Sequence, residues 1–249
     1  MRRWVTALLT VAVMMSACAN RHSVPSNKPI IRRIAIIPAS NPTWYSFENA
    51  PPLAVAAMGG LGDLSYKLNS KSKAKAFNNV LLSQPSTLGT DFTAEVAAAL
   101  RAAGFTVDVL QGVKRPPDDP DNVDFAGISS DADAILNLWI SEVGLYSSML
   151  SRDHVPRLNA FGKLVVKGRK DSIYDEEIDY GVDAKKESKL GIVADPKFAY
   201  PSFDAVMSNI DEIRKSFGIG TLQISERLSE QIANSPNYLK GATESRPVP

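Results

Sequence analysis

The sequence predicts an α/β (α+β) domain, in which a small mixed sheet of about five strands is covered by an amphipathic helix and a long C-terminal helix. Two observations favour this class. Residues 30–38 form a β-branched run that is apolar on both faces and ends at a proline, as a central strand does. Residues 88–103 then show helical spacing, with one apolar stripe made of Leu88, Phe92, Val96, Leu100 and Ala103.

Both ends of the helix at 88–103 have local signals. Ser86 or Thr90 can cap its start, and Gly104 suits the left-handed residue that commonly follows a helix. Residues 105–110 are predicted to be the second strand. The order strand, helix, strand implies a right-handed crossover, so these two strands should pair in parallel.

Three more strands are expected after a loop at 111–130. Residues 133–140 form the third strand, which continues through Val143 and Leu145. Residues 159–170 and 172–182 are predicted to form an antiparallel hairpin that turns at Lys170 and Asp171.

The last of these strands alternates strictly. Tyr174, Glu176, Ile178 and Tyr180 share one face, and Asp175, Glu177 and Asp179 share the other. This period of two indicates a half-exposed antiparallel strand. Three carboxylates on one strand face are most often solvated, although they leave open a site for a cation.

A long helical region follows the loop at 190–200. Ser202 can cap its start. Gly218 and Gly220 predict a kink or a break within it. The apolar stripe of this region comprises Val206, Ile210, Ile213, Phe217, Ile224, Leu228 and Ile232.

The N-terminus has the order of a secretory signal. Arg2 and Arg3 precede an apolar run over residues 4–15, and Ser16 and Ala17 then lead into Cys18, the only cysteine. This stretch resembles the lipobox of bacterial lipoproteins, with Met15 where leucine is usual. The resemblance implies that the Cys18 thiol receives a diacylglyceryl group, that residues 1–17 are removed, and that the new amino terminus is acylated, for example with palmitate. The alternative is an ordinary cysteine in an uncleaved or conventionally cleaved signal.

Lipidation at Cys18 would determine where the protein works. Two or three acyl chains give permanent membrane binding, since each buried methylene contributes roughly 0.8 kcal/mol. The residue after the cysteine is Ala19; in enterobacterial lipoproteins an aspartate there favours the inner membrane, so we expect an outer-membrane anchor facing the periplasm. The predicted organisation is a signal peptide at 1–17, a lipidated tether at 18–29, a single periplasmic domain at 30–234 with an insertion at 41–84, and a disordered tail at 235–249.

The insertion combines an uncharged, glycine-containing stretch with a basic run that includes Lys67, Lys71, Lys73 and Lys75. Such a segment could lie on an anionic membrane surface or on a partner. The alternative, which we favour, is an inserted loop and helix packed on its own domain. Without the two signal arginines, 26 of the 28 basic side chains remain against 27 acidic ones, so nucleic acid is not an expected partner.

No motif for catalysis, cofactor binding or metal binding is present in the sequence. Acylation of Cys18 would leave no thiol, and the two histidines are His22 on the tether and His154 in a polar stretch. Neither a Gly-x-Ser-x-Gly turn nor a His-Glu-x-x-His pair occurs, and the acidic residues between Asp118 and Asp124 lack the alternation and glycine of a calcium loop. We therefore expect no enzyme, no cofactor and no metal.

Taken together, the elements resemble the small periplasmic domain shared by the curli-secretion lipoprotein and the amino-terminal domain of the Tol translocation protein. The resemblance is carried by residues 34–38, by the helix that ends at Gly104, and by residues 131–136 and 174–181. It implies a non-enzymatic domain that assembles, often into rings, or docks other envelope proteins. In channel members an inserted segment builds a membrane barrel, but 41–84 lacks the alternating pattern of barrel strands.

The function that we predict is a lipid-anchored, non-catalytic assembly or docking lipoprotein of the outer membrane, which could be accessory to envelope transport or secretion. Its partners would be the membrane, through Cys18, and envelope proteins or further copies of itself. One alternative is a module that binds a small molecule at the strand ends or a cation at Asp175, Glu177 and Asp179. A third hypothesis is a hydrolase that uses His154 as its base.

Overall fold

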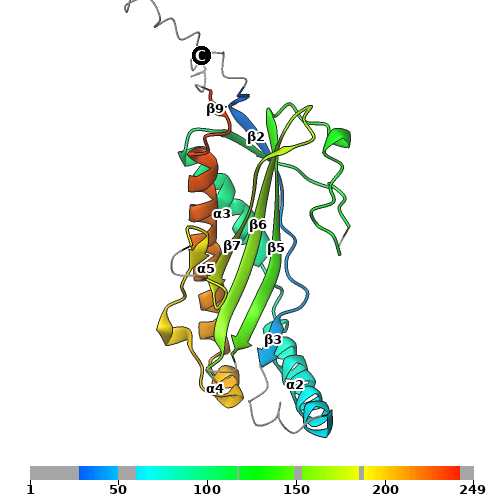
Figure 1. Ribbon diagram of the computed structural model, residues 1–249, viewed down its shortest axis with the longest axis vertical. Coiled ribbons are helices and arrows are strands. Elements are labelled where there is room, and N and C mark those ends of the chain that lie inside the picture. Colours follow the sequence, from blue (N-terminus) through cyan, green and yellow to red (C-terminus); the bar gives the residue numbers. More distant parts are fainter. Residues whose placement is uncertain (1–27, 50–59, 117, 149–152, 185–187, 242–249) are drawn as a thin grey trace, which may run out of the picture.

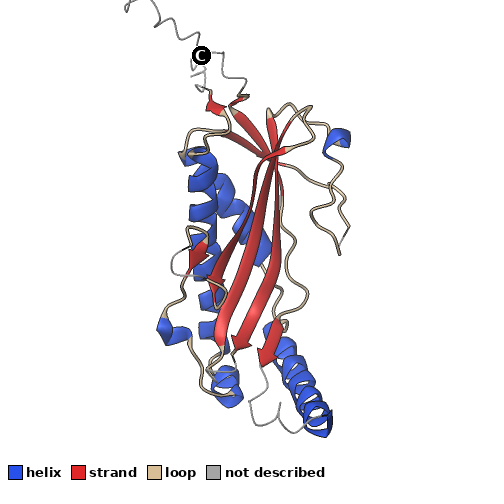
Figure 2. Ribbon diagram, in the orientation of Figure 1, coloured by secondary structure: helices blue, strands red, loops and turns tan. Residues whose placement is uncertain are grey.

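The computed structural model describes residues 28–49, 60–116, 118–148, 153–184 and 188–241. Its main feature is a seven-stranded mixed sheet in the order β4-β2-β5-β6-β7-β8, with β3 paired to a further part of β5. Figures 1 and 2 show the sheet as a tall, twisted layer with the long helices on one side. Its strands are β2 (Arg33–Ile37), β3 (Ser46–Asn49), β4 (Thr106–Val109), β5 (Ala134–Ser147), β6 (Val155–Val166), β7 (Ser172–Gly181) and β8 (Gly191–Ile192).

The strand pairings confirm the predicted topology. β2 pairs in parallel with β4 and with β5, as the strand-helix-strand order requires. β6 pairs antiparallel with β5 on one side and with β7 on the other, in long ladders. The sheet contains two short strands, β3 and β8, beyond the five that were predicted. Each pairs over only a few residues with the edge of a longer strand.

β2 is central and buried on both faces, as its apolar sequence indicated. Ile34 and Ile36 face the main core, whereas Ala35 and Ile37 face a second, smaller core under the loop between β4 and β5. That loop contains the 3-10 turn η1 (Phe125–Gly127) and covers only the upper part of this face. No helix of the described residues covers the lower part of the same face (Figure 1).

The main core lies between the sheet and two helices, α3 (Leu88–Ala102) and α5 (Ile210–Ala233). Both helices pack against each other on one face of the sheet, as predicted from their apolar stripes (Figure 1). Full burial of a valine, leucine or isoleucine side chain contributes roughly 1.5–3 kcal/mol to the free energy of unfolding. The fully buried side chains of the stripes include Val96, Leu100, Ile213, Ile224, Leu228 and Ile232.

The cap of α3 differs from the prediction. Its N-cap residue Thr87 makes no side-chain capping bond, and the predicted Ser86 accepts only a long hydrogen bond, at 3.4 Å, from the N–H of Leu88. Instead the side-chain oxygen of Asn41 accepts hydrogen bonds from the backbone N–H groups of Gly89 (2.8 Å) and Thr90 (3.0 Å). The free donors at a helix start can be satisfied by any nearby oxygen, and here the segment after β2 supplies it. At the other end Gly104 has a φ of 90°, so the predicted left-handed stop is confirmed.

α5 is continuous through Gly218 and Gly220, so a break in the helix at these glycines, one form of the predicted kink or break, does not occur. Gly220 is needed for close packing: a Cβ atom there would lie 2.7 Å from the Tyr180 ring. The break in the helical region occurs earlier, at Asn209, between α4 (Phe203–Ser208) and α5. Ser202 caps α4 as expected, accepting a hydrogen bond from the Ala205 N–H at 3.1 Å.

These two glycines provide a matched stability test. Gly220→Ala should lower the free energy of unfolding by about 1–3 kcal/mol, because the new methyl group overpacks the core against Tyr180. Gly218→Ala should raise it by up to about 1 kcal/mol, because no atom lies within 4 Å of the new methyl group and alanine favours the helix. Denaturant unfolding of both variants measures the difference. Equal effects at the two positions would contradict the packing role of Gly220.

The chain from residue 235 to 241 is ordered, in contrast to the predicted disorder of this tail. β9 (Leu239–Lys240) pairs in parallel with β1 (Ile30–Ile31). Tyr238 is buried, and its hydroxyl group donates to the Ile232 carbonyl oxygen. The apolar ring of Tyr238 and the free edge of β1 explain this order, and the domain therefore extends to Gly241.

The insertion after β2 forms β3 and the helix α2 (Gly60–Leu81), which is anchored on its own domain. Phe77 and Leu81 are buried, and the side chain of Asn78 binds both the N–H (2.7 Å) and the carbonyl oxygen (2.6 Å) of Tyr45. Among the described residues, no helix has the length and apolarity needed to span a membrane. Figure 1 places α2 at the opposite end of the molecule from β9, and therefore far from the point where β1 begins.

Candidate binding cleft beside strand β5

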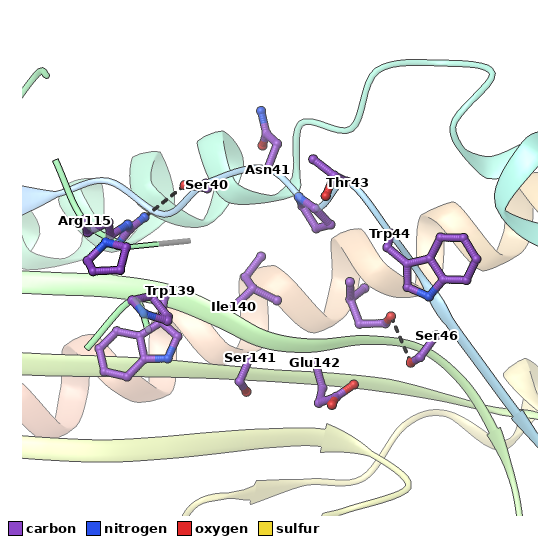
Figure 3. A pocket seen from close by; sticks show the side chains of 14 residues that line it. Ser40, Asn41, Thr43, Trp44, Ser46, Arg115, Trp139, Ile140, Ser141 and Glu142 are labelled. Atoms are coloured by element: carbon purple, nitrogen blue, oxygen red, sulfur yellow. Dashed lines mark hydrogen bonds between the residues drawn. The ribbon is translucent and has the colours of Figure 1, made fainter. Parts of the chain in front are cut away.

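A cleft of about 540 Å³ lies beside β5, between its two parallel neighbours. β2 pairs with β5 only as far as Asn137, and β3 pairs with it only from Gly144 onward. Between these points residues 38–45 run past β5 without pairing to it, and the cleft opens between the two segments (Figure 3). Its walls are Ser40, Asn41, Pro42, Thr43, Trp44, Ser46, Arg115, Pro116, Pro120, Trp139, Ile140, Ser141, Glu142 and Val143.

Two tryptophans give the cleft an aromatic character. Trp139 is buried and stacks on Phe161 of β6, with ring centroids 4.8 Å apart and planes within 5° of parallel. Trp44 is 55% exposed, which is unusual for the largest apolar side chain of a folded domain. An exposed tryptophan on the rim of a cleft is typical of a binding surface.

Arg115 closes one end of the cleft. Its guanidinium group donates to the side-chain oxygen of Asn137 (2.9 Å) and to the carbonyl oxygens of Leu138 (2.7 Å) and Pro38 (2.6 Å). A fourth hydrogen bond, at 3.2 Å, goes to the Ser40 hydroxyl group. These acceptors are neutral, and burial lowers the pKa of Arg115 from its usual value. Arg115 thus fixes the loop after β4 to two places: the segment that follows β2, and the part of β5 where its pairing with β2 ends.

The other end of the cleft is acidic. A β-bulge at Ser141 interrupts the register of β5 with β6, and beyond it Glu142, Asn159 and Asp179 lie in one row across three strands. The Ser141 hydroxyl group donates to the Glu177 carboxylate at 2.7 Å. Bulges re-aim side chains and are frequent beside functional sites.

Around this row of residues, negatively charged side chains outnumber positively charged ones. Arg157 forms ion pairs with Asp183 (2.7 Å) and Glu48 (3.4 Å). Partial burial raises the pKa of Glu142; Arg157 opposes this rise, while the neighbouring carboxylates Glu48, Asp183 and Glu177 add to it. The surface next to the cleft therefore carries more negative than positive charge and favours a cationic group.

The carboxylates of β7 do not form a metal site. Asp175 pairs with Lys163 at 3.4 Å, and Glu177 accepts the hydrogen bond from Ser141. Within the part of the chain that the structure describes, no group of three or more histidine, cysteine, aspartate or glutamate side chains is arranged to hold a metal ion. The cation-binding alternative at Asp175, Glu177 and Asp179 thus gains no support from their geometry.

His154 was predicted to lie in a polar loop, but it is buried and forms part of a β-bridge. Its backbone forms an isolated antiparallel bridge with Tyr200, and its ring stacks on Phe47 with centroids 4.9 Å apart. Nε2 lies 2.6 Å from the side-chain oxygen of Asn49, and Nδ1 lies 3.3 Å from the Tyr200 carbonyl oxygen. Phe47 and Tyr200 thus enclose His154, which explains why the ring packs in the interior.

Protonation of His154 should make stability depend on pH. Burial is the main cause that lowers its pKa, so the unfolded chain takes up a proton at a higher pH than the folded chain. The free energy of unfolding should therefore fall as the pH drops from about 6.5 to the lowered folded-state pKa, and this contribution should then stay constant. Denaturant unfolding of the wild-type protein and His154→Gln between about pH 5 and 8 measures it. An identical pH slope in both proteins would contradict this account.

Few of the candidate residues that were predicted from the sequence lie at this cleft. Cys18, His22 and the tether as far as residue 27 lie outside the described residues. His154 and the β7 carboxylates lie away from the cleft walls, with the exception of the contact from Glu177 to Ser141. The cleft residues Trp44, Trp139 and Arg115 were not predicted. The available signals were a tryptophan within the aliphatic run of β5 and an arginine directly before Pro116.

No protein-family model matches this chain, and no curated protein does so either. Among solved structures, the hypothetical protein CT253 from Chlamydia trachomatis is similar with 10% identity and a TM-score of 0.40, over 82% of this chain and 97% of that one. Protein XCC0632 from Xanthomonas campestris has 10% identity and a TM-score of 0.37, over 61% of this chain and 63% of its own. Lipoprotein GNA1162 from Neisseria meningitidis has 15% identity and a TM-score of 0.30, over 74% and 99%. TM-scores below 0.5 carry no conclusion about function, so the resemblance to the curli-secretion and Tol proteins stays a prediction.

Proposed function

We propose that this protein is a lipid-anchored, non-catalytic docking lipoprotein of the outer membrane, which faces the periplasm and binds another envelope component at the cleft beside β5. The observation that carries the proposal is the cleft itself, with the exposed Trp44 on its rim and, at one end, an acidic surface whose charge Arg157 balances only in part. Aromatic anchors surrounded by polar groups are typical of protein-binding surfaces. A role accessory to transport or secretion is compatible with an anchor in the outer membrane that faces the periplasm.

The lining of the cleft favours binding over catalysis. Arg115 is engaged by four neutral acceptors, and the described residues that line the cleft include no histidine, lysine or cysteine. A serine nucleophile such as Ser141 is usually activated by a histidine or lysine base, which this lining does not supply. The tether proposed at Cys18 would enter at β1, the end of the domain opposite α2, and would leave the length of β5 accessible in the periplasm.

In-cell crosslinking tests the proposal. A photo-reactive benzoylphenylalanine in place of Trp44 should form a covalent adduct with a discrete envelope protein. The matched control is the same probe in place of Leu222, which is 43% exposed on α5, away from the cleft. Adducts from position 44 that are absent from position 222 and reduced by Cys18→Ser support docking by a tethered protein. No adduct from position 44, or the same adducts from both positions, would contradict it.

A second candidate function is the binding of a small molecule in the same cleft. Its volume of about 540 Å³ lies in the usual range for ligand pockets, and its lining mixes aromatic and polar groups. A ligand that binds only the folded state raises the melting temperature by mass action. A thermal-shift screen against the wild-type protein and Trp44→Ala separates this function from protein docking, because only a small-molecule site should respond to low-molecular-weight compounds.

A further inference from the structure

The cleft exposes an unpaired stretch of strand edge. Among the described residues, β5 has a strand partner on this edge up to Asn137 and again from Gly144, and residues 138–143 have none there. The carbonyl oxygens of Leu138 and Val143 point to this edge, because Arg115 and the Ser46 hydroxyl group donate to them from that side. At about 3.3 Å per residue the unpaired stretch is roughly 20 Å long.

The peptide groups of Ile140 belong to the same edge. Alternate residues of a strand direct their backbone N–H and C=O groups to the same side, and Ile140 is two residues from Leu138. The segment that passes alongside does not complete the ladder: it contains Pro42, which has no N–H to donate. An edge of this kind accepts an extended chain readily.

We propose that an extended segment of a partner protein adds to β5 at residues 138–143 as a short strand and fills the gap between β2 and β3. This proposal rests on the docking function proposed above and specifies how the partner binds. Main-chain hydrogen bonds to Ile140 and its neighbours would supply affinity that is independent of the partner's side chains.

The walls of the cleft specify the chemistry of the partner. Side chains on one face of an added strand would meet Trp139 and Trp44, which favours an aliphatic or aromatic residue. A side chain near the bulge at Ser141 would meet Glu142 and, beyond it, Asp179. The partner segment is therefore extended, apolar at one position and basic at a position close to it.

Selected peptides test this inference on the full mature chain. A displayed library of random octapeptides is panned on the wild-type protein and counter-selected on Trp44→Ala. The best binder is synthesised in three forms: unmodified, N-methylated at alternate peptide groups, and with its basic residue replaced by glutamate. Strand addition predicts at least about tenfold weaker binding for both altered forms, since each loses main-chain hydrogen bonds or charge complementarity. It also predicts slower amide exchange at Ile140 when the unmodified peptide is bound.

Several outcomes would overturn the inference. These are a panning experiment that enriches no Trp44-dependent peptide, equal binding of the N-methylated peptide, and unchanged amide exchange at Ile140. Glu142→Gln is the matched variant for charge: it should reduce the preference for the basic peptide over the glutamate form and leave the effect of N-methylation unchanged. If crosslinks from position 44 persist in cells while strand addition fails, the docking function stands and only this binding mode is wrong.

Discussion

Replacing Gly181 by alanine is expected to lower the free energy of unfolding by about 2–5 kcal/mol, one of the largest effects that a single methyl group can have in this domain. Gly181 ends β7 with a φ of 93°, a left-handed conformation that costs other residues roughly 1–2 kcal/mol. Its Cβ atom would also overlap the carbonyl oxygen of Pro156, which is backbone and has little freedom to move. The β6–β7 pairing would therefore separate at this end.

The control for this prediction is Gly168→Ala. Gly168 has a similar φ of 80°, but no atom lies within 4 Å of a Cβ atom at that position. In the control, the free energy of unfolding should therefore fall only by the cost of the left-handed backbone conformation, about 1–2 kcal/mol. Thermal unfolding compares the two variants, and a melting temperature for Gly181→Ala that is equal to or above that of Gly168→Ala would contradict the assigned contact.

Arg115→Met is expected to have the second large effect, a loss of about 2–4 kcal/mol in the free energy of unfolding together with release of the loop after β4. The substitution keeps an unbranched apolar stem but removes four hydrogen bonds. Asn137 is fully buried, so its side-chain oxygen would then lack this donor. A buried polar group without a partner costs more than the average hydrogen bond contributes.

Hydrogen exchange and denaturant unfolding together measure this effect. The amides of Val113 and Ile128, which lie within the loop, should exchange faster in Arg115→Met, while those of α5 should change only with global stability. Arg115→Lys provides the control, because a single ammonium group can replace only part of the planar guanidinium network. An unchanged denaturant midpoint and unchanged loop exchange in Arg115→Met would show that Arg115 does not hold the loop.

The elements that could be predicted from the sequence are those with strong local periodicity. The β-branched run of β2 predicts burial of both faces, the stripe of α3 and the alternation of β7 each predict one buried face, and the structure follows all three. The fold class follows from their order, because a strand-helix-strand unit has one favoured handedness. The long α5 was also found from its stripe, although its two glycines were misread.

The features that were missed depend on contacts between residues far apart in the chain. β3 is a four-residue strand that becomes a strand only by pairing with β5, about a hundred residues later. Asn41 caps a helix that begins more than forty residues after it, and Gly220 is required by a tyrosine on another strand. No local pattern reports such contacts.

The candidate cleft was missed for the same reason. It is a gap between two pairings of β5, and it becomes visible only once β2 and β3 are both placed. Its residues come from the segment after β2, the loop after β4 and the middle of β5. Of these, Trp44 and Arg115 fall in segments without periodicity, where sequence patterns carry the least information.

The central claim is that a covalently tethered domain works by binding, and the state of Cys18 tests it most directly. Mass spectrometry of the mature protein should find a chain that begins at Cys18 and carries a diacylglyceryl group and an amide-linked acyl group. The Cys18→Ser variant should keep residues 1–17 and carry no lipid. A mature protein with an unmodified Cys18 sulfur, or one cleaved at another residue, would contradict the account.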